Sequence, residues 1–218
     1  MVDYEQTGLY SQVMSSSTGR VPAKSEASAR DRLLAAADEL FYGEGIHTVG
    51  IDRVLAHAGV AKASLYSTFG SKEELVLAYL QGRADERFRR ITSAMAGHDH
   101  PRDKLLAIYD QLADRAVDPN FRGCAFVNAS AEGPPGDSKV RRVCRGSRDW
   151  VRGVFAGLAR ELGADDPELL GRQLLLLYEG AMLGASMTRD ATAPRDARRL
   201  AEALLDAQKL GARRKTSR

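Results

Sequence analysis

The side chains best suited to bind an anionic partner gather between residues 50 and 72. No acidic residue occurs from Arg53 to Lys72, so this stretch is locally basic. Hydroxyl and ammonium groups are common protein donors to phosphate oxygens. The donors in this stretch are Lys62, Ser64, Tyr66, Ser67, Thr68 and Lys72. The chemistry that these residue types predict is therefore contact with a phosphate backbone.

A tight turn between two short helices would position these donors. The first predicted helix begins after Gly50 and ends at Gly59, and its apolar face is Ile51, Val54, Leu55 and Ala58. The second runs from about Lys62 to Phe69, and small residues at its start would let it enter a major groove. This spacing predicts a helix-turn-helix motif, although a generic pair of packed helices would also explain it.

The sequence around the turn resembles the DNA-binding signature of the TetR/AcrR transcriptional regulators. The resemblance rests on Ala58 to Leu75 (AGVAKASLYSTFGSKEEL), and Leu33 to Phe41 with Gly45 is similar to the family's first helix. It covers residues 28 to about 80. It implies an all-α homodimeric repressor, with an N-terminal three-helix helix-turn-helix (HTH) DNA-binding domain joined to a helical ligand-binding and dimerisation domain.

Carried over by position, the resemblance implies that Lys62, Ala63, Tyr66 and Ser67 face DNA and that Lys72 clamps a phosphate. Two positions depart from the family, which usually has Ser or Thr in place of Gly50 and often Ser in place of Ala61. Glycine caps a helix nearly as well as serine, so the helix is preserved but a hydroxyl is lost. The candidate DNA-binding residues are Gly50, Ala61, Lys62, Ala63, Ser64, Tyr66, Ser67, Thr68 and Lys72.

Apolar periodicity predicts helices along almost the whole chain from Ser28 onward, so the fold class is all-α. Ser28 with Asp31 and Ser71 with Glu74 mark two helix starts as capping boxes. The remaining predicted helices span about 101–118, 123–132, 138–162, 166–187 and 194–210. Four segments follow: a disordered N-terminal extension (1–24), the HTH domain (25–72), the ligand-binding and dimerisation domain (73–210) and a basic C-terminal tail (211–218).

A small-molecule inducer pocket is expected in the core of the second domain, where ligand would change the tilt of the helix that begins at Ser71. Polar groups there must be paired, hydrated or turned toward a cavity. The candidate pocket residues are Phe88, Met95, Tyr109, Phe126, Asn128, Trp150, Gln173, Tyr178 and Met182. They predict a largely apolar inducer with one or two polar groups, although each residue individually is equally well explained as ordinary core.

The last two predicted helices, numbers eight and nine in the chain, are expected to form the homodimer. Leu174, Leu177, Ala181 and Gly184 recur at helical spacing, and the last two are small enough for another helix to approach. Leu200, Leu204 and Leu205 offer a second stripe. Together they favour a four-helix interface about a two-fold axis.

Composition limits the other functions that the chain could have. The 218 residues carry a net charge of +3, and no apolar run is long enough to span a membrane. The N-terminus lacks the pattern of a signal peptide, and two cysteines make neither a disulfide framework nor a metal cage, so a cytoplasmic protein is expected. Common enzyme motifs are absent, and neither a cofactor nor a metal is expected.

Weaker signals leave some alternatives open. Cys124 and Cys144 could form a thiol switch, although two packed apolar residues explain them better. A small helical enzyme or carrier with an HTH-like hairpin is the alternative from another functional class. His98–Asp99–His100 could touch a metal, although an exposed loop explains it better. The arginine stripe 141–152 could form a rim for an anionic inducer, although a solvated face explains it well. Arg20, Lys24 and Arg30 could line a minor-groove arm, and the basic C-terminal residues are best explained as a solvated end.

Overall fold

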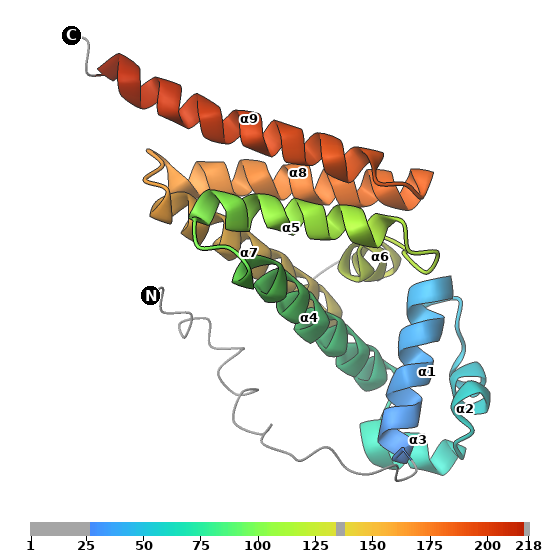
Figure 1. Cartoon of the computed structure of the whole chain (residues 1–218). Coiled ribbons are helices and arrows are strands. Elements are labelled where there is room, and N and C mark those ends of the chain that lie inside the picture. The colour runs from blue at the N-terminus through green and yellow to red at the C-terminus, as the bar shows by residue number, and fades with distance from the viewer. Residues whose placement is uncertain (1–26, 134–137, 216–218) are drawn as a thin grey trace.

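The computed structural model describes residues 27–133 and 138–215, with side chains through Gln208. This part of the chain consists of nine α-helices and contains no strand (Figure 1). The helices are α1 (Ala29–Glu44), α2 (Ile51–Ala58), α3 (Lys62–Phe69), α4 (Lys72–Ala96), α5 (Pro101–Ala116), α6 (Ala125–Glu132), α7 (Lys139–Glu161), α8 (Pro167–Thr188) and α9 (Thr192–Lys215). The predicted all-α fold is therefore confirmed.

Side-chain caps begin the helices where the sequence predicted them. The Ser28 hydroxyl accepts a hydrogen bond from the Asp31 backbone N–H at 3.1 Å and donates to the Asp31 carboxylate at 2.7 Å. The Ser71 hydroxyl likewise accepts from the Glu74 N–H at 3.1 Å. The Glu74 carboxylate, however, pairs with Lys139 on α7 at 2.7 Å. The capping-box motif therefore predicted the start of α4 correctly, but it did not predict that Glu74 pairs with Lys139.

The C-terminal end of the described chain differs from the prediction. α9 begins at Thr192 and continues to Lys215, so residues 211–215 belong to the helix. A separate tail from residue 211 is therefore wrong for those five residues. The expected N-terminal extension (1–24), with Arg20 and Lys24 of the minor-groove arm, lies outside the described residues.

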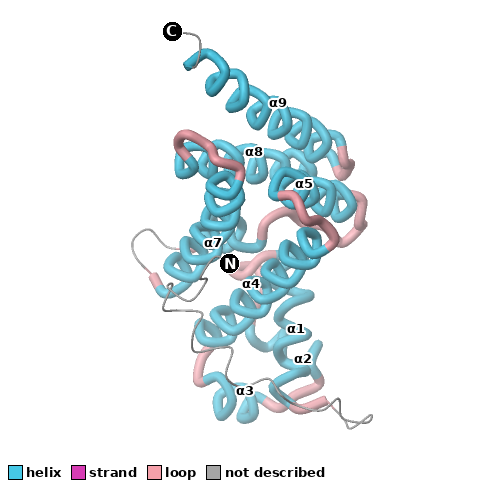
Figure 2. The backbone as a smooth tube through the Cα atoms, turned by 60° about the vertical axis from the view of Figure 1, so that its left-hand side comes forward, coloured by secondary structure: helices cyan, strands magenta, loops and turns pink. Residues whose placement is uncertain are grey.

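Two hydrophobic clusters make up the interior. One joins α1–α3 to the first half of α4, and it also takes in Phe126 and Ala129 of α6 and Cys144 of α7. The other is built from α5, α7, α8 and α9 with the end of α4. α4 links the two ends of the molecule (Figure 2). Packing therefore does not divide at residue 72, where the sequence placed a domain boundary.

Three aromatic rings fill the centre of the second cluster. The rings of Tyr109, Phe155 and Tyr178 lie with their centroids 5.9–6.1 Å apart. The Tyr109 hydroxyl donates to the Leu174 carbonyl at 2.7 Å, so its polar group is satisfied inside the core. Burial raises the pKa of Tyr109, which keeps this hydroxyl protonated as a donor.

The stripe predicted for the dimer interface faces inward instead. Leu174 and Ala181 are buried, and a side chain at Gly184 would meet Ala193 of the same chain at 2.7 Å. The exposed apolar residues of α8 are Leu169, Leu176, Leu183 and Met187. The phase was misassigned because this helix is apolar on nearly every side, so periodicity does not distinguish its inner face from its outer face.

No helix in the described part of the chain combines the length and apolarity needed to cross a membrane.

Candidate nucleic-acid interface

The turn between α2 and α3 depends on Gly59. This residue has φ +61° and ψ 40°, the left-handed conformation that glycine adopts without strain. Its N–H donates to the Ala56 carbonyl, and the next N–H, of Val60, reaches back to Leu55 at 3.1 Å. These bonds close the end of α2 as in a Schellman motif and turn the chain into α3.

α3 buries one side chain and exposes most of the others. Leu65 is fully buried in the N-terminal cluster, whereas Tyr66 is 48% exposed. Of the predicted DNA-binding residues, Ser64 and Lys72 are half-buried. The exposed ones are Gly50, Ala61, Lys62, Ala63, Tyr66, Ser67 and Thr68. The outer face of α3 is therefore a protruding surface of small and hydroxyl-bearing residues.

The N-termini of α2 and α3 lack side-chain caps. Gly50 and Ala61 occupy the two cap positions, and neither makes a side-chain cap hydrogen bond. The first backbone N–H groups of a helix point out from its end and favour anions. The two departures from the family pattern thus remove hydroxyls but leave backbone donors at the places where a phosphate would sit.

The basic residues beside α3 are held in exposed ion pairs. Lys62 lies 3.3 Å from Asp52, and both side chains are well exposed. Arg53, which the sequence analysis did not select, forms a two-point pair with Glu44 at 2.5 and 2.7 Å. Exposed pairs contribute little free energy, so a phosphate can compete for either cation.

Lys72 lies differently from the prediction. Its ammonium donates to the carbonyls of Ile46 and Val49 at 2.7 and 2.6 Å, and it lies 5.8 Å from the centre of the Phe41 ring. Two of its three donors therefore hold the loop between α1 and α2. These bonds give the Lys72 ammonium an internal role, and the phosphate contact expected from the sequence stays a prediction.

Comparison with known proteins places this HTH in a family. Residues 33–79 match the model of the bacterial regulatory proteins of the tetR family. A TetR-family transcriptional regulator from Streptomyces coelicolor has a crystal structure that is 35% identical in sequence, with a TM-score of 0.79 over 82% of this chain and 95% of that chain. The chain belongs to the TetR family.

Other transcriptional regulators also match this chain over most of its length. A putative regulator from Streptomyces avermitilis is 30% identical over 84% of this chain and 99% of that chain, with a TM-score of 0.73. The transcriptional repressor NemR of Escherichia coli is 29% identical over 75% of this chain and 87% of its own length. A crystal structure of reduced NemR has a TM-score of 0.72 at 26% identity, over 80% of this chain and 95% of that chain. The chain is thus a DNA-binding transcriptional regulator and not an enzyme.

Polar contacts that the sequence did not reveal tie the TetR-family HTH to the C-terminal helices. The Tyr42 hydroxyl on α1 donates to the Gly123 carbonyl at 3.0 Å and accepts from the Arg122 N–H at 2.9 Å. Glu132, at the end of α6, accepts from the His47 N–H at 2.7 Å. Gly45 lies so close that a side chain there would meet the Glu132 carboxylate at 3.1 Å. We call these contacts, with Lys139–Glu74 and Arg83–Asp38, the seam.

Arg83 of α4 forms the most buried ion pair of the seam. Its Nη2 donates to Asp38 at 2.9 Å, and its guanidinium stacks over the Tyr42 ring at 3.9 Å. Burial raises the pKa of the Asp38 carboxyl, and the nearby Arg83 offsets only part of that rise. Ionised Asp38 is therefore maintained at some cost and depends on Arg83.

A buried arginine lies beside one of the two cysteines. Arg87 on α4 is 8% exposed and donates to the Ser147 hydroxyl at 3.2 Å and to the Cys124 sulfur at 3.0 Å. Burial alone would lower the pKa of Arg87, but Cys124 and Tyr178 outweigh it and the pKa lies above its usual range. Cys144 differs, since burial raises the pKa of its thiol. The sequence analysis did not select Arg87, which lies one helical turn beyond the buried Ala84 on α4.

The nine predicted pocket residues do not line one cavity in the described structure. Tyr178 and Met182 border a cavity of about 30 Å³ next to Arg87, which is the size of one water molecule. Phe88 instead packs on Trp150, with ring centroids 5.3 Å apart, between α4 and α7. Tyr109 and Phe126 are core residues, Met95 and Gln173 are half-buried, and Asn128 is exposed.

The histidine loop has a structural role. His100 caps α5, its ring nitrogen accepting from the Arg102 N–H at 3.2 Å. Among the described residues, no group of three His, Cys, Asp or Glu side chains is placed to hold a metal ion.

Proposed function

We propose that the chain is a ligand-responsive repressor that binds a pseudo-palindromic operator as a dimer in the cytoplasm and is released by a small molecule. The observation that carries the DNA contact is the exposed outer face of α3, flanked by two helix starts without side-chain caps. The candidate DNA-binding residues other than Lys72 lie on or beside this face.

Selection from a pool of random DNA duplexes tests the proposal without a known operator. We expect enrichment of one inverted repeat, and fluorescence anisotropy should then show binding at least about 10³-fold tighter than to a scrambled duplex. Two recognition helices about 34 Å apart require half-sites one helical turn apart or somewhat more. Binding with no sequence preference would contradict a specific regulator.

We infer that the dimer forms through α8 and α9. Exposed Leu176, Leu183 and Met187 recur along α8 with Gly180, and Leu200 is 55% exposed on α9. Monomers seldom expose large contiguous apolar patches, so the stripe favours an isologous helical interface. This replaces the inward-facing residues predicted from the sequence.

A charge in the middle of that stripe tests the interface. Leu183→Glu should convert a dimer into a monomer in light scattering and abolish tight operator binding. Val117→Glu is the matched control, since Val117 is equally exposed (62%) but lies at the end of α5. A monomeric wild-type chain at micromolar concentration would contradict the inference.

A thiol sensor remains the second candidate, because Arg87 lies against Cys124. The Arg87 guanidinium donates to the Cys124 sulfur at 3.0 Å, and the thiolate is the nucleophilic form of a cysteine. A thiolate attacks hydrogen peroxide to give a sulfenic acid and hydroxide. The existence of a structure of reduced NemR, which this chain resembles, also keeps this candidate open.

Peroxide titration separates the two candidates. A thiol sensor would lose operator binding on treatment, recover with dithiothreitol, and become insensitive in Cys124→Ser. The control Cys144→Ser should behave as wild type. Operator binding that withstands peroxide in the wild type would exclude this candidate and leave the small-molecule reading.

A further inference from the structure

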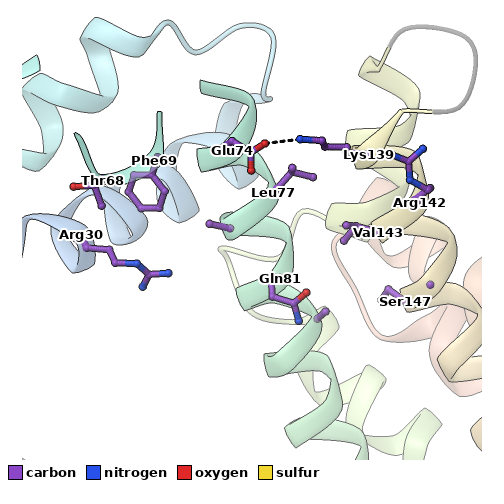
Figure 3. A pocket seen from close by; sticks show the side chains of 13 residues that line it. Arg30, Thr68, Phe69, Glu74, Leu77, Gln81, Lys139, Arg142, Val143 and Ser147 are labelled. Atoms are coloured by element: carbon purple, nitrogen blue, oxygen red, sulfur yellow. Dashed lines mark hydrogen bonds and ion pairs between the residues drawn. The ribbon is translucent and has the colours of Figure 1, made fainter. Parts of the chain in front are cut away.

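A groove lies on α4, outside the core in which the inducer was expected. Its volume is about 580 Å³, within the range of sites for one small molecule. α4 forms the floor, the end of α3 and the start of α1 form one wall, and α7 forms the other (Figure 3). Any occupant would touch both the HTH and the C-terminal helices.

Apolar side chains line part of the floor and part of both walls of the groove. Leu77 and Ala78 lie on the floor, Phe69 lines one wall and Val143 the other. Leu77 points from α4 toward the α7 side, where Val143 lies (Figure 3). Gly146 adds open space, because a side chain built there meets no atom within 4 Å. These surfaces fit an aliphatic or aromatic body.

The charged residues around the groove are mostly cationic. Arg30, Lys139 and Arg142 line it against a single carboxylate, that of Glu74. Arg30 lies over the Phe69 ring at 5.7 Å. Glu74 bridges the groove to Lys139 at 2.7 Å, and this pair raises the pKa of the Lys139 ammonium (Figure 3). A ligand carboxylate would meet a net positive rim and would compete with Glu74 for Lys139.

We propose that this groove binds an amphipathic organic anion, a carboxylate on an apolar body. The proposal deepens the proposed function, because it names the class of the small molecule and moves its site from the core to the junction of α3, α4 and α7. The Glu74–Lys139 pair joins the first turn of α4 to α7, so a ligand that takes Lys139 would break one link between the HTH end of α4 and α7.

The only tryptophan of the chain is suited to report binding. Trp150 lies one turn beyond Gly146 on α7, and Phe88 lies one turn beyond Ala84 on α4. Their rings, 5.3 Å apart, therefore lie one helical turn beyond residues that line the groove. A ligand that moves α4 relative to α7 should change the fluorescence of Trp150.

The test titrates the full chain, without DNA, with decanoate, decanol and decyltrimethylammonium below their micelle concentrations. Decanoate should saturate a change in Trp150 fluorescence and raise the melting temperature, with at least fivefold higher affinity than decanol. The cationic probe should not bind. Equal binding of decanoate and decanol, or no binding of decanoate, would overturn the proposal.

Two leucine substitutions locate the site. Gly146→Leu fills the groove and should abolish decanoate binding. Gly153→Leu is the matched control, since Gly153 is also a helical glycine of α7 with no atom within 4 Å of a side chain built on it, and it does not line the groove. Decanoate binding that survives Gly146→Leu would also overturn the proposal. Because these measurements omit DNA, their failure is distinct from a failure of operator binding.

Discussion

The outer face of α3 and the seam are both polar surfaces, but their polar groups are used differently. On α3, Lys62 has only an exposed pair with Asp52, and the Tyr66 hydroxyl makes no hydrogen bond to the described residues. In contrast, Tyr42 of the seam and Lys72 at the start of α4 each make two hydrogen bonds to backbone atoms of distant segments. The face of α3 has donors left for a partner, whereas Tyr42 and Lys72 use theirs mainly to hold the fold together.

The same difference is found between two lysines of the HTH region, Lys62 and Lys72. Lys62 and Lys72 lie ten positions apart, and both were expected to contact phosphate. In the structure only Lys62 has its ammonium on the outer surface. A basic residue in an HTH signature therefore indicates DNA contact only after the loop carbonyls within its reach have been considered.

Lys72→Met should give the largest effect on stability. It removes two charge-assisted bonds, to the Ile46 and Val49 carbonyls, so we expect the free energy of unfolding to fall by about 2–4 kcal/mol. The salt dependence of DNA binding should not change. Urea unfolding gives the first quantity and anisotropy across a range of salt concentrations gives the second.

If Lys72→Met instead reduced the salt dependence of DNA binding and left stability unchanged, Lys72 would act as the phosphate clamp predicted from the sequence. The same substitution at Lys62 serves as the control for removing a lysine.

Arg83→Met compared with Arg53→Met contrasts a seam ion pair with an exposed one. The Arg83 side chain is 13% exposed and that of Arg53 is 55% exposed. Loss of Arg83 leaves Asp38 half-buried without its cation and should cost about 1–3 kcal/mol of unfolding free energy. Loss of Arg53 should cost less than about 0.5 kcal/mol, because exposed pairs contribute little. If both substitutions lowered the free energy of unfolding equally, the seam pair would stabilise the fold no more than the exposed pair does.

The stability that Arg83→Met loses should depend on pH through the carboxyl of Asp38. Its folded-state pKa lies above its usual value because of burial, so the folded state holds a proton where the unfolded state has released it. Stability therefore falls as pH rises through the window between the two pKa values, and it is flat above that window. Removing Arg83 raises the folded pKa further, so the deficit of Arg83→Met should be largest at neutral pH and should shrink on acidification.

The parts of the fold that could be predicted depend on short sequence separations. The caps at Ser28 and Ser71, the turn at Gly59 and the bounds of α3 all arise within a few residues. The seam joins residues far apart in sequence, such as Tyr42 with Gly123, and no local pattern encodes such a pair. Nor does periodicity orient α8, whose apolar residues surround it.

Lys62→Met should weaken DNA binding while leaving the protein as stable as the wild type. Loss of one phosphate contact should reduce the slope of log K against log salt by about 0.9 and should weaken specific and nonspecific duplexes alike. Because the pair with Asp52 is exposed at 3.3 Å, stability should change by less than about 0.5 kcal/mol. An unchanged salt slope would mean that the outer face of α3 does not meet phosphate through Lys62.

Tyr66→Phe and Ser67→Ala together give the smallest and most local comparison. Both remove one hydroxyl from the exposed face of α3, but the Ser67 hydroxyl already donates to the Ser64 carbonyl at 3.1 Å. The Tyr66 hydroxyl has no partner among the described residues, so it is the one left for a phosphate. We expect Tyr66→Phe to weaken operator binding about three- to tenfold, the net value of one hydrogen bond of about 1 kcal/mol, without lowering the melting temperature. Ser67→Ala should change affinity less than twofold. The reverse order in anisotropy titrations would show that the helix gives up its internal bond to reach DNA, and that bonding in the free protein does not predict which donors the operator uses.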